Sequence, residues 1–218
     1  MKTFLQHSIS LFERGEPFAI ATVLSREGSA PRRAGARMII RKNGKSFGTI
    51  GGGSLEAEVF RSAEQVLANQ HPVVRQFDLT GSIDSATMLC GGRVEVLIDY
   101  VDPGRRELHS AWHAALQAFQ TKTATWLITA VPDNSSAPPS IFCCLTASGE
   151  TTGALQPDKD LLDQVKGLAS ARLPWLTQKD GKRFFVEPLT GLPRVLIFGS
   201  GHIAQQLAML TVLAAFKT

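Results

Sequence analysis

Cysteine is scarce in this chain of 218 residues, which contains three cysteines, and two of them, Cys143 and Cys144, are adjacent. Such a set cannot build the disulfide framework of a small secreted domain. The first residues alternate apolar and polar side chains, which is not the pattern of a secretory signal peptide. With neither feature present, we expect a protein of the reducing cytoplasm.

Long apolar runs are also missing, and aromatic residues are few. No stretch approaches the roughly 18 consecutive apolar residues of a membrane-spanning helix, so we expect no membrane contact. Only one tyrosine is present, and no aromatic residue lies among the basic residues between Arg26 and Lys45. Because single-stranded nucleic acids are bound largely by stacking bases on aromatic rings, we expect no nucleic-acid partner.

Acidic residues are nearly absent from the segment between Arg26 and Lys45, which has seven basic residues and one acid, Glu27. The whole chain has a net charge of only +4, so the positive charge is concentrated here. A local field of this strength favours an anionic partner. The alternative is a solvated loop and an edge strand that is protected by its charges.

Three consecutive glycines, Gly51, Gly52 and Gly53, separate an apolar β-branched run from an amphipathic run. This pattern predicts a strand, a turn without side chains and a helix start. Bare glycines let backbone N–H groups face a ligand, and the N-terminus of a helix adds positive potential. We therefore expect this loop, with Ser54, to hold an anionic group. Glu56 lies in the first helical turn, where the helix dipole favours a carboxylate whatever the function.

The apolar periodicity predicts four helices and eight strands before residue 190. Residues 81–89 are expected to be irregular or to form one helical turn, and Asn43-Gly44 indicates a hairpin. The helices are predicted over 1–14, 55–69, 105–121 and 161–171, and the strands over 18–24, 36–41, 46–50, 73–79, 93–101, 125–131, 141–145 and 183–189.

The order of these elements repeats, which predicts two degenerate copies of one helix–strand–hairpin–helix–strand unit over residues 1–103 and 104–190. Gly149 and Gly153 follow Gly44 and Gly48 at an offset of 105 residues, and the strand 183–189 is equated with 73–79. The predicted class is α+β, a mixed sheet with flanking helices. The second copy lacks the arginines and has Gln156-Pro157-Asp158 in place of the glycines, so we expect the first copy alone to bind.

The third predicted segment, residues 191–218, begins like a dinucleotide-binding unit. A predicted buried strand over 194–198 leads into the G-x-G-x-x-A motif of Gly199, Gly201, His202 and Ala204, and an apolar helix follows. The acid expected about 20 residues further on is absent, because the chain stops at Thr218. We expect an incomplete Rossmann-type α/β domain that is cut off at its C-terminus, with His202 exposed at the helix start and no NAD(P) binding.

Several motifs together resemble the XdhC/CoxI family, the accessory proteins of xanthine dehydrogenases. The resemblance spans nearly the whole chain, and it rests on 21–23, 28–32, 35–38, 48–56, 90–92, 184–188 and 197–202. It implies a cytoplasmic chaperone that binds a molybdopterin-type molybdenum cofactor, or its nucleotide form, and assists its sulfuration and insertion. It implies no catalytic residue. The implied partners are a molybdenum hydroxylase of the xanthine dehydrogenase or aldehyde oxidase type and a cysteine desulfurase-type sulfur donor, and the chain is expected to form a homodimer.

The resemblance also marks the residues that would hold this cofactor. Arginine forks and backbone N–H groups suit a phosphate, and a thiolate suits a soft molybdenum–sulfur centre, so Cys90 is the candidate molybdenum contact. Some family members carry cysteines where this chain has Ser54 and Leu89, so a mechanism that needs two neighbouring thiols is not expected. The implied cofactor-binding set is Arg32, Arg37, Gly51, Gly52, Gly53, Ser54, Glu56, Cys90, Gly91 and Gly92.

Two other functions are compatible with parts of the sequence. The motif at 199–204 is typical of an NAD(P)-dependent oxidoreductase or a regulatory nucleotide-binding module, and the basic segment is compatible with a scaffold that binds an acidic protein. A zinc site is not expected, because His109 and His113 have helical i, i+4 spacing but no third ligand near them in the sequence.

Overall fold

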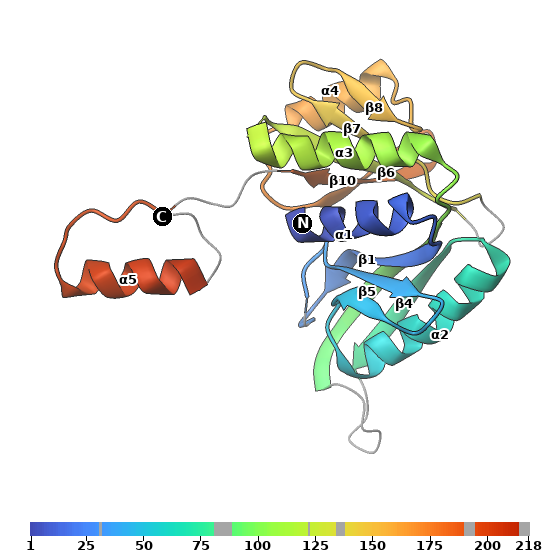
Figure 1. Cartoon of the computed structure of the whole chain (residues 1–218), viewed down its shortest axis with the longest axis horizontal. Coiled ribbons are helices and arrows are strands. Elements are labelled where there is room, and N and C mark those ends of the chain that lie inside the picture. The colour runs from blue at the N-terminus through green and yellow to red at the C-terminus, as the bar shows by residue number, and fades with distance from the viewer. Residues whose placement is uncertain (31, 81–88, 122, 134–137, 190–194, 214–218) are drawn as a thin grey trace.

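The computed structural model describes residues 1–30, 32–80, 89–121, 123–133, 138–189 and 195–213 (Figure 1). Two successive units contain the same series of elements, helix–three strands–helix–two strands. The first unit consists of α1 (Lys2–Glu13), β1 (Phe18–Glu27), β2 (Arg37–Arg41), β3 (Ser46–Gly48), α2 (Gly53–Asn69), β4 (Val73–Thr80) and β5 (Leu89–Val101). The second consists of α3 (Arg106–Thr121), β6 (Thr125–Val131), β7 (Phe142–Thr146), β8 (Thr151–Gly153), α4 (Lys159–Gly167), β9 (Trp175–Lys179) and β10 (Lys182–Pro188).

Each unit forms its own five-stranded sheet, and every neighbouring pair of strands is antiparallel. The strand orders are β3-β2-β1-β5-β4 and β8-β7-β6-β10-β9. They are the same when each strand of the first unit is matched to the strand at the same place in the second. The predicted α+β class is confirmed, although the strands make two antiparallel sheets rather than one mixed sheet. The division of the chain into domains at residues 103 and 190 stays a prediction.

One strand equivalence predicted from the sequence is wrong. Strand β10 lies beside β6 as β5 lies beside β1, so the counterpart of 183–189 is β5 and not 73–79. The true counterpart of β4 is the edge strand β9, which the sequence pattern did not predict. Its sequence, WLTQK, has no clear alternation of apolar and polar residues, because this edge strand is only partly covered.

Two glycines at the ends of the hairpins are required for the same physical reason. A Cβ atom on Gly48 would lie 2.4 Å from the carbonyl oxygen of Arg37, and one on Gly153 would lie 2.4 Å from that of Phe142. Both glycines also have positive φ angles, of 89° and 137°, which residues with a Cβ rarely adopt. The offset of 105 residues between these glycines therefore relates positions with the same steric constraint.

Helices α1 and α3 lie side by side between the two sheets, while α2 and α4 cover the outer faces (Figure 1). The fully buried Trp112 on α3 lies at the centre of this middle layer. Its ring contacts Phe12 of α1, Phe18 of β1 and Phe142 of β7, with centroid distances of 6.0, 6.0 and 5.5 Å. One aromatic residue thus joins both sheets and the neighbouring helix, and burial of such rings supplies much of the packing energy of a core.

Beyond the helices, the two sheets contact each other directly through residues that the repeat relates. Leu97 of β5 packs with Phe185 of β10 in one small core. Arg183 donates to both carboxylate oxygens of Glu95 at 2.9 and 3.1 Å across a separation of 88 residues. The same separation relates Leu97 to Phe185, so repeat-related positions meet each other as in an isologous dimer interface.

The strand registers also equate two acids, the partly buried Asp99 opposite Ile20 and the buried Glu187 opposite Leu127. Each acid binds the opposite unit: Glu187 pairs with Arg37, and Asp99 accepts a hydrogen bond of 3.0 Å from the backbone N–H of Ser140. Burial raises the pKa of Asp99 to about 6, although its hydrogen bonds from Ser140 and Tyr100 act in the opposite direction.

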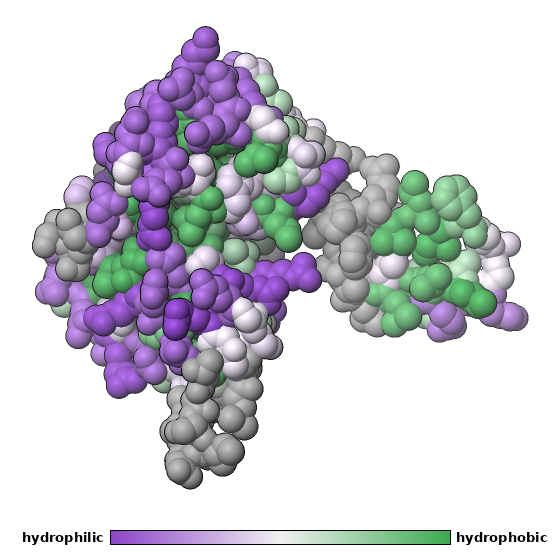
Figure 2. All heavy atoms as spheres, turned by 180° about the vertical axis from the view of Figure 1, so that it is seen from behind, coloured by the Kyte–Doolittle hydropathy of each residue, from purple (hydrophilic) through white to green (hydrophobic). Residues whose placement is uncertain are grey.

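Residues 195–200, by contrast, form no strand, which corrects the predicted buried strand at this place. Phe198 is 92% exposed and Leu196 is 67% exposed, because no described strand lies beside this segment to pair with it. The following helix α5 (His202–Leu213) lies apart from the two sheets and presents exposed apolar side chains (Figures 1 and 2). His202 begins this helix and is exposed, as expected. Among the described residues, no helix is long and apolar enough to cross a membrane.

The raised pKa of Asp99 predicts a pH-dependent stability. The folded protein holds this proton up to about pH 6, whereas an unfolded aspartic acid releases it near pH 4. The free energy of unfolding should therefore fall as the pH rises from 4 to 6, by about 2–3 kcal/mol. Asp99→Asn keeps the acceptor oxygen but cannot ionise, so it should match the wild type at pH 4 and exceed it by that amount at pH 8 in urea unfolding.

The exposed acid Asp163 on α4 offers a matched control. Asp163→Asn should follow the wild-type curve at both pH values, because an exposed carboxylate loses little solvation on folding. Equal pH dependence of Asp99→Asn and the wild type would contradict the assignment.

Candidate functional site

The glycine loop connects the end of β3 to the start of α2, as predicted. Gly51, Gly52 and Gly53 have φ angles of 143°, 79° and 61°, so three successive residues occupy backbone conformations that favour glycine. This path brings the backbone N–H groups of Ile50 and Gly52 to Glu56 Oε1, at 3.1 and 3.0 Å. The loop thus forms a concave set of donors around a carboxylate of the same chain.

Glu56 therefore has a defined role in the loop. Its Oε1 also accepts a hydrogen bond of 2.6 Å from the hydroxyl of Thr49. Burial raises the pKa of Glu56, but the hydrogen bonds from Thr49 and from the loop backbone outweigh it, and the pKa lies below its ordinary value. An internal carboxylate thus occupies the donors of Ile50 and Gly52, which an external anion would otherwise use.

Arg37, at the start of β2, is held by the second unit. Its guanidinium group forms a short ion pair with Glu187 of β10, and the two side chains are 9% and 2% exposed. The guanidinium carbon also lies 5.6 Å from the centre of the Phe4 ring. Burial raises the pKa of Glu187 and the charge of Arg37 lowers it, with burial the larger effect. Arg37 Nε and Glu187 Oε1 are buried without a hydrogen-bond partner among the described residues.

A pocket of about 350 Å³ lies between the start of α1, the loop before β2 and the end of β3. It brings together both predicted arginines, Arg32 and Arg37, and Thr49 from the glycine loop. Arg32 is exposed and has no ion pair or hydrogen bond with a described residue. The pocket is lined by Met1, Thr3, Phe4, Arg32, Gly35, Ala36, Arg37, Phe47, Gly48 and Thr49.

Gly35 shows how closely the second unit approaches this pocket. Its φ angle is +85°, and a Cβ atom there would lie 2.8 Å from Pro174 Cγ and 3.4 Å from Glu187 Oε1. A larger residue would therefore push against the segment that holds Arg37. The pocket belongs to the first unit, but its back wall depends on the second.

Other predicted residues lie elsewhere in the first unit. Gly92 of β5 touches the loop after β1, since a Cβ atom on it would lie 2.4 Å from Ser29 O and 2.6 Å from Glu27 O. Gly91 has a φ angle of +67°, and, apart from its chain neighbours, no atom of a described residue lies within 4 Å of a Cβ placed on it. Ser54 lines a separate pocket of about 110 Å³ beside Asp78. The backbone of Cys90 is part of β5, but its side chain lies outside the described part of the chain.

The corresponding positions of the second unit are built differently. Asp158 stands 105 residues after Gly53, and its carboxylate caps α4 by accepting a hydrogen bond of 2.9 Å from Leu161 N. A single side chain here satisfies the helix end, where the first unit uses three glycines and Glu56. The second unit thus keeps the strand–turn–helix path without the pocket-side donors.

Sequence reasoning missed two residues that shape the site. Thr49 could have been found, because a hydroxyl directly before a glycine run is well placed to bind the loop. Glu187 lies 150 residues from Arg37 in the chain, and no local pattern links them.

Comparisons with known proteins agree with the resemblance drawn from the sequence. Residues 11–78 match the XdhC and CoxI family. A Bacillus subtilis protein that is named as a probable subunit of xanthine dehydrogenase is 25% identical over 211 residues, which cover 95% of this chain and 60% of that protein. The uncharacterized protein YqeB of Escherichia coli is 35% identical over 89 residues, covering 40% of this chain and 16% of that protein.

A solved structure shows the same fold. The crystal structure of a protein named as a xanthine dehydrogenase from Bacillus halodurans matches with a TM-score of 0.68 and 20% identity. The match covers 95% of this chain and 60% of that one, so the chain spans about 60% of the length of both Bacillus proteins.

The two pocket arginines should differ sharply in their contribution to stability. Arg37→Ala leaves Glu187 buried without its counter-charge, and loss of one partner of a buried pair costs about 3–5 kcal/mol. Arg32→Ala removes an exposed side chain without a partner among the described residues, so the free energy of unfolding should change by less than about 0.5 kcal/mol. Urea unfolding of both variants measures the difference, and equal losses would contradict the roles given to the two residues.

Proposed function

We propose that this chain, whose residues 11–78 match the XdhC and CoxI family, binds a molybdopterin-type cofactor as cargo for a xanthine dehydrogenase-type molybdenum hydroxylase. The observation that carries the proposal is the pocket at residues 32–49, where an arginine without a partner among the described residues faces a concave surface of the family segment. Its volume of about 350 Å³ lies at the lower end of the range typical of small-molecule sites.

The residues in the pocket fit the anionic part of such a cofactor. The exposed guanidinium group of Arg32 suits a phosphate, with which arginine forms paired, charge-assisted hydrogen bonds. Arg37 is neutralised by Glu187, so it serves to shape the pocket rather than to bind the phosphate. Arg33, Lys42 and Lys45 lie nearby in the sequence without an acidic partner among the described residues, and their field attracts an anion.

The glycine loop has a positioning role in this proposal. Glu56 holds the N–H groups of Ile50 and Gly52 and the hydroxyl of Thr49, which fixes the edge of the pocket that Thr49 lines. The molybdenum–sulfur part of the cofactor would need a soft ligand, and Cys90 is our candidate for it. Assistance in sulfuration, with a cysteine desulfurase-type donor, and a homodimeric state are further parts of the proposal.

Binding of purified molybdopterin cofactor tests the role of Arg32, and the chain offers a matched control. Arg32→Ala should weaken binding about tenfold or more, as expected for loss of a hydrogen bond between charged groups. Arg33→Ala removes the same charge from the next residue, which does not line the pocket, and should weaken binding less than about threefold. Both affinities can be measured by fluorescence titration under anaerobic conditions.

Equal effects of Arg32→Ala and Arg33→Ala would show a diffuse charge effect and would contradict the assignment of the pocket.

Cys90→Ala should lower the molybdenum content of protein purified with the cofactor, as measured by metal and pterin analysis. Tight binding of NAD(H) or NADP(H) with no binding of molybdopterin would instead favour a nucleotide-binding module at 199–204.

A further inference from the structure

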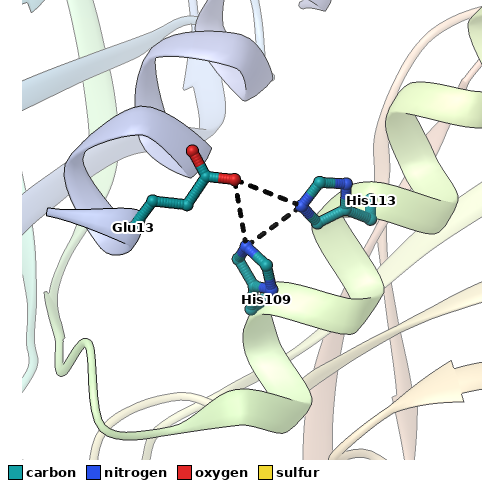
Figure 3. A group of neighbouring side chains, drawn as sticks. All are labelled: Glu13, His109 and His113. Carbon is teal, nitrogen blue, oxygen red and sulfur yellow. Dashed lines mark hydrogen bonds and ion pairs between the residues drawn. The ribbon is translucent and has the colours of Figure 1, made fainter. Parts of the chain in front are cut away.

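Three metal-ligating side chains meet on the surface between α1 and α3, far along α1 from the cofactor pocket. His109 and His113 extend from successive turns of α3, and Glu13 extends toward them from the last residue of α1 (Figure 3). The two Nε2 atoms lie 3.0 Å apart. Glu13 Oε1 lies 3.9 Å from His109 Nε2 and 4.0 Å from His113 Nε2. The third ligand that the sequence did not reveal is therefore supplied by the neighbouring helix.

The packing of the middle layer fixes this arrangement. The ring of His109 stacks on Phe12 with a centroid distance of 4.8 Å, and Phe12 in turn contacts Trp112 edge-on. Phe12 and Trp112 are buried, so the positions of α1 and α3 along each other are determined by the core. Glu13 directly follows Phe12, and this places its carboxylate opposite the histidine pair.

We propose that Glu13, His109 and His113 bind one Zn²⁺ ion through Oε1 and the two Nε2 atoms, with water as the fourth ligand. Bonds of about 2.0–2.1 Å in a tetrahedral site separate the ligand atoms by about 3.3–3.5 Å. The three separations of 3.0, 3.9 and 4.0 Å bracket that value. Small side-chain movements close the difference, since Glu13 is 58% exposed and His113 is 49% exposed.

The three donor groups suit a divalent cation. A metal ligand must be the neutral imidazole, and the two imidazoles present their Nε2 atoms to each other at 3.0 Å. The carboxylate of Glu13, whose Oε1 lies within 4.0 Å of both Nε2 atoms, provides a negative charge for the ion. Two imidazoles and one carboxylate form a donor set that zinc accepts readily, with the fourth position open.

Such an ion would join the two units of the fold. Glu13 belongs to the first unit and the histidines to the second, so Zn²⁺ would cross-link α1 to α3. The cofactor pocket contacts the other end of α1, at Met1, Thr3 and Phe4, and a helix of 12 residues is about 18 Å long. The proposed zinc site is therefore separate from the proposed cofactor site, and a result that contradicts one proposal leaves the other standing.

Isothermal titration of the untagged 218-residue chain with Zn²⁺ tests the proposal. We expect one ion per chain, and about tenfold or greater weakening in His109→Ala and in His113→Ala, because even the loss of a supporting partner costs a metal site 10–100-fold. Glu13→Gln keeps the shape of the side chain but removes its charge, and it should also weaken binding. His202→Ala is the matched control, because it also removes one of the five histidines. It should bind Zn²⁺ as the wild type does.

Thermal unfolding provides a second readout, because a ligand that binds only the folded state raises the melting temperature. Saturating Zn²⁺ should raise the melting temperature of the wild type and of His202→Ala, and the increase should vanish in His109→Ala/His113→Ala. Co²⁺ in place of Zn²⁺ should give the visible absorption of a tetrahedral site in the wild type and not in the double variant. No Zn²⁺ binding by the wild type, or equal binding by the double variant, would overturn the proposal.

Discussion

The buried ion pair between Arg37 and Glu187 is the constraint on which the rest of the site depends. It ties the start of β2 in the first unit to β10 in the second, and it occupies the guanidinium group that would otherwise dominate the pocket. Gly35 lies so close to Pro174 and Glu187 that a Cβ atom at this position would crowd them. Its positive φ angle is also one that glycine adopts readily. Because breaking such a pair leaves a buried charge uncompensated, the geometry of the pocket and the packing of the two units are coupled.

The glycine loop, like the ion pair, positions the pocket and does not itself bind the ligand. On its sequence alone the loop suits an external anion, but Glu56 already accepts its central N–H groups. The loop instead fixes Thr49 at the pocket wall, and Arg32 is left as the pocket arginine without an acidic partner among the described residues. In the second unit, the side chain of Asp158 caps the helix that follows the equivalent turn. The two units therefore share a backbone path but differ in the groups that satisfy the start of the helix.

Much of the scaffold could be predicted from the sequence, because it rests on local signals: the continuous apolar run of β1, apolar alternation in β5, helical periodicity in α2 and α3, and the glycines at 48 and 153. Features that depend on contacts between residues far apart in the sequence could not be predicted. Neither the ion pair of Arg37 with Glu187 nor the approach of Glu13 to the histidines has a local pattern. Strand β9 was missed since an edge strand buries too little to show alternation, and the apolar run at 195–198 predicted a strand that has no described neighbour to pair with.

The most direct test of the central claim, that the pocket at residues 32–49 receives the cofactor, is a map of backbone amide chemical shifts by NMR during titration with molybdopterin cofactor. We expect the largest changes at Arg32, Gly35, Gly48 and Thr49, and small changes at the equivalent hairpin of the second unit, residues 142–153. Changes centred on the second unit or on residues 199–205, with the amides of 32–49 unmoved, would contradict the claim.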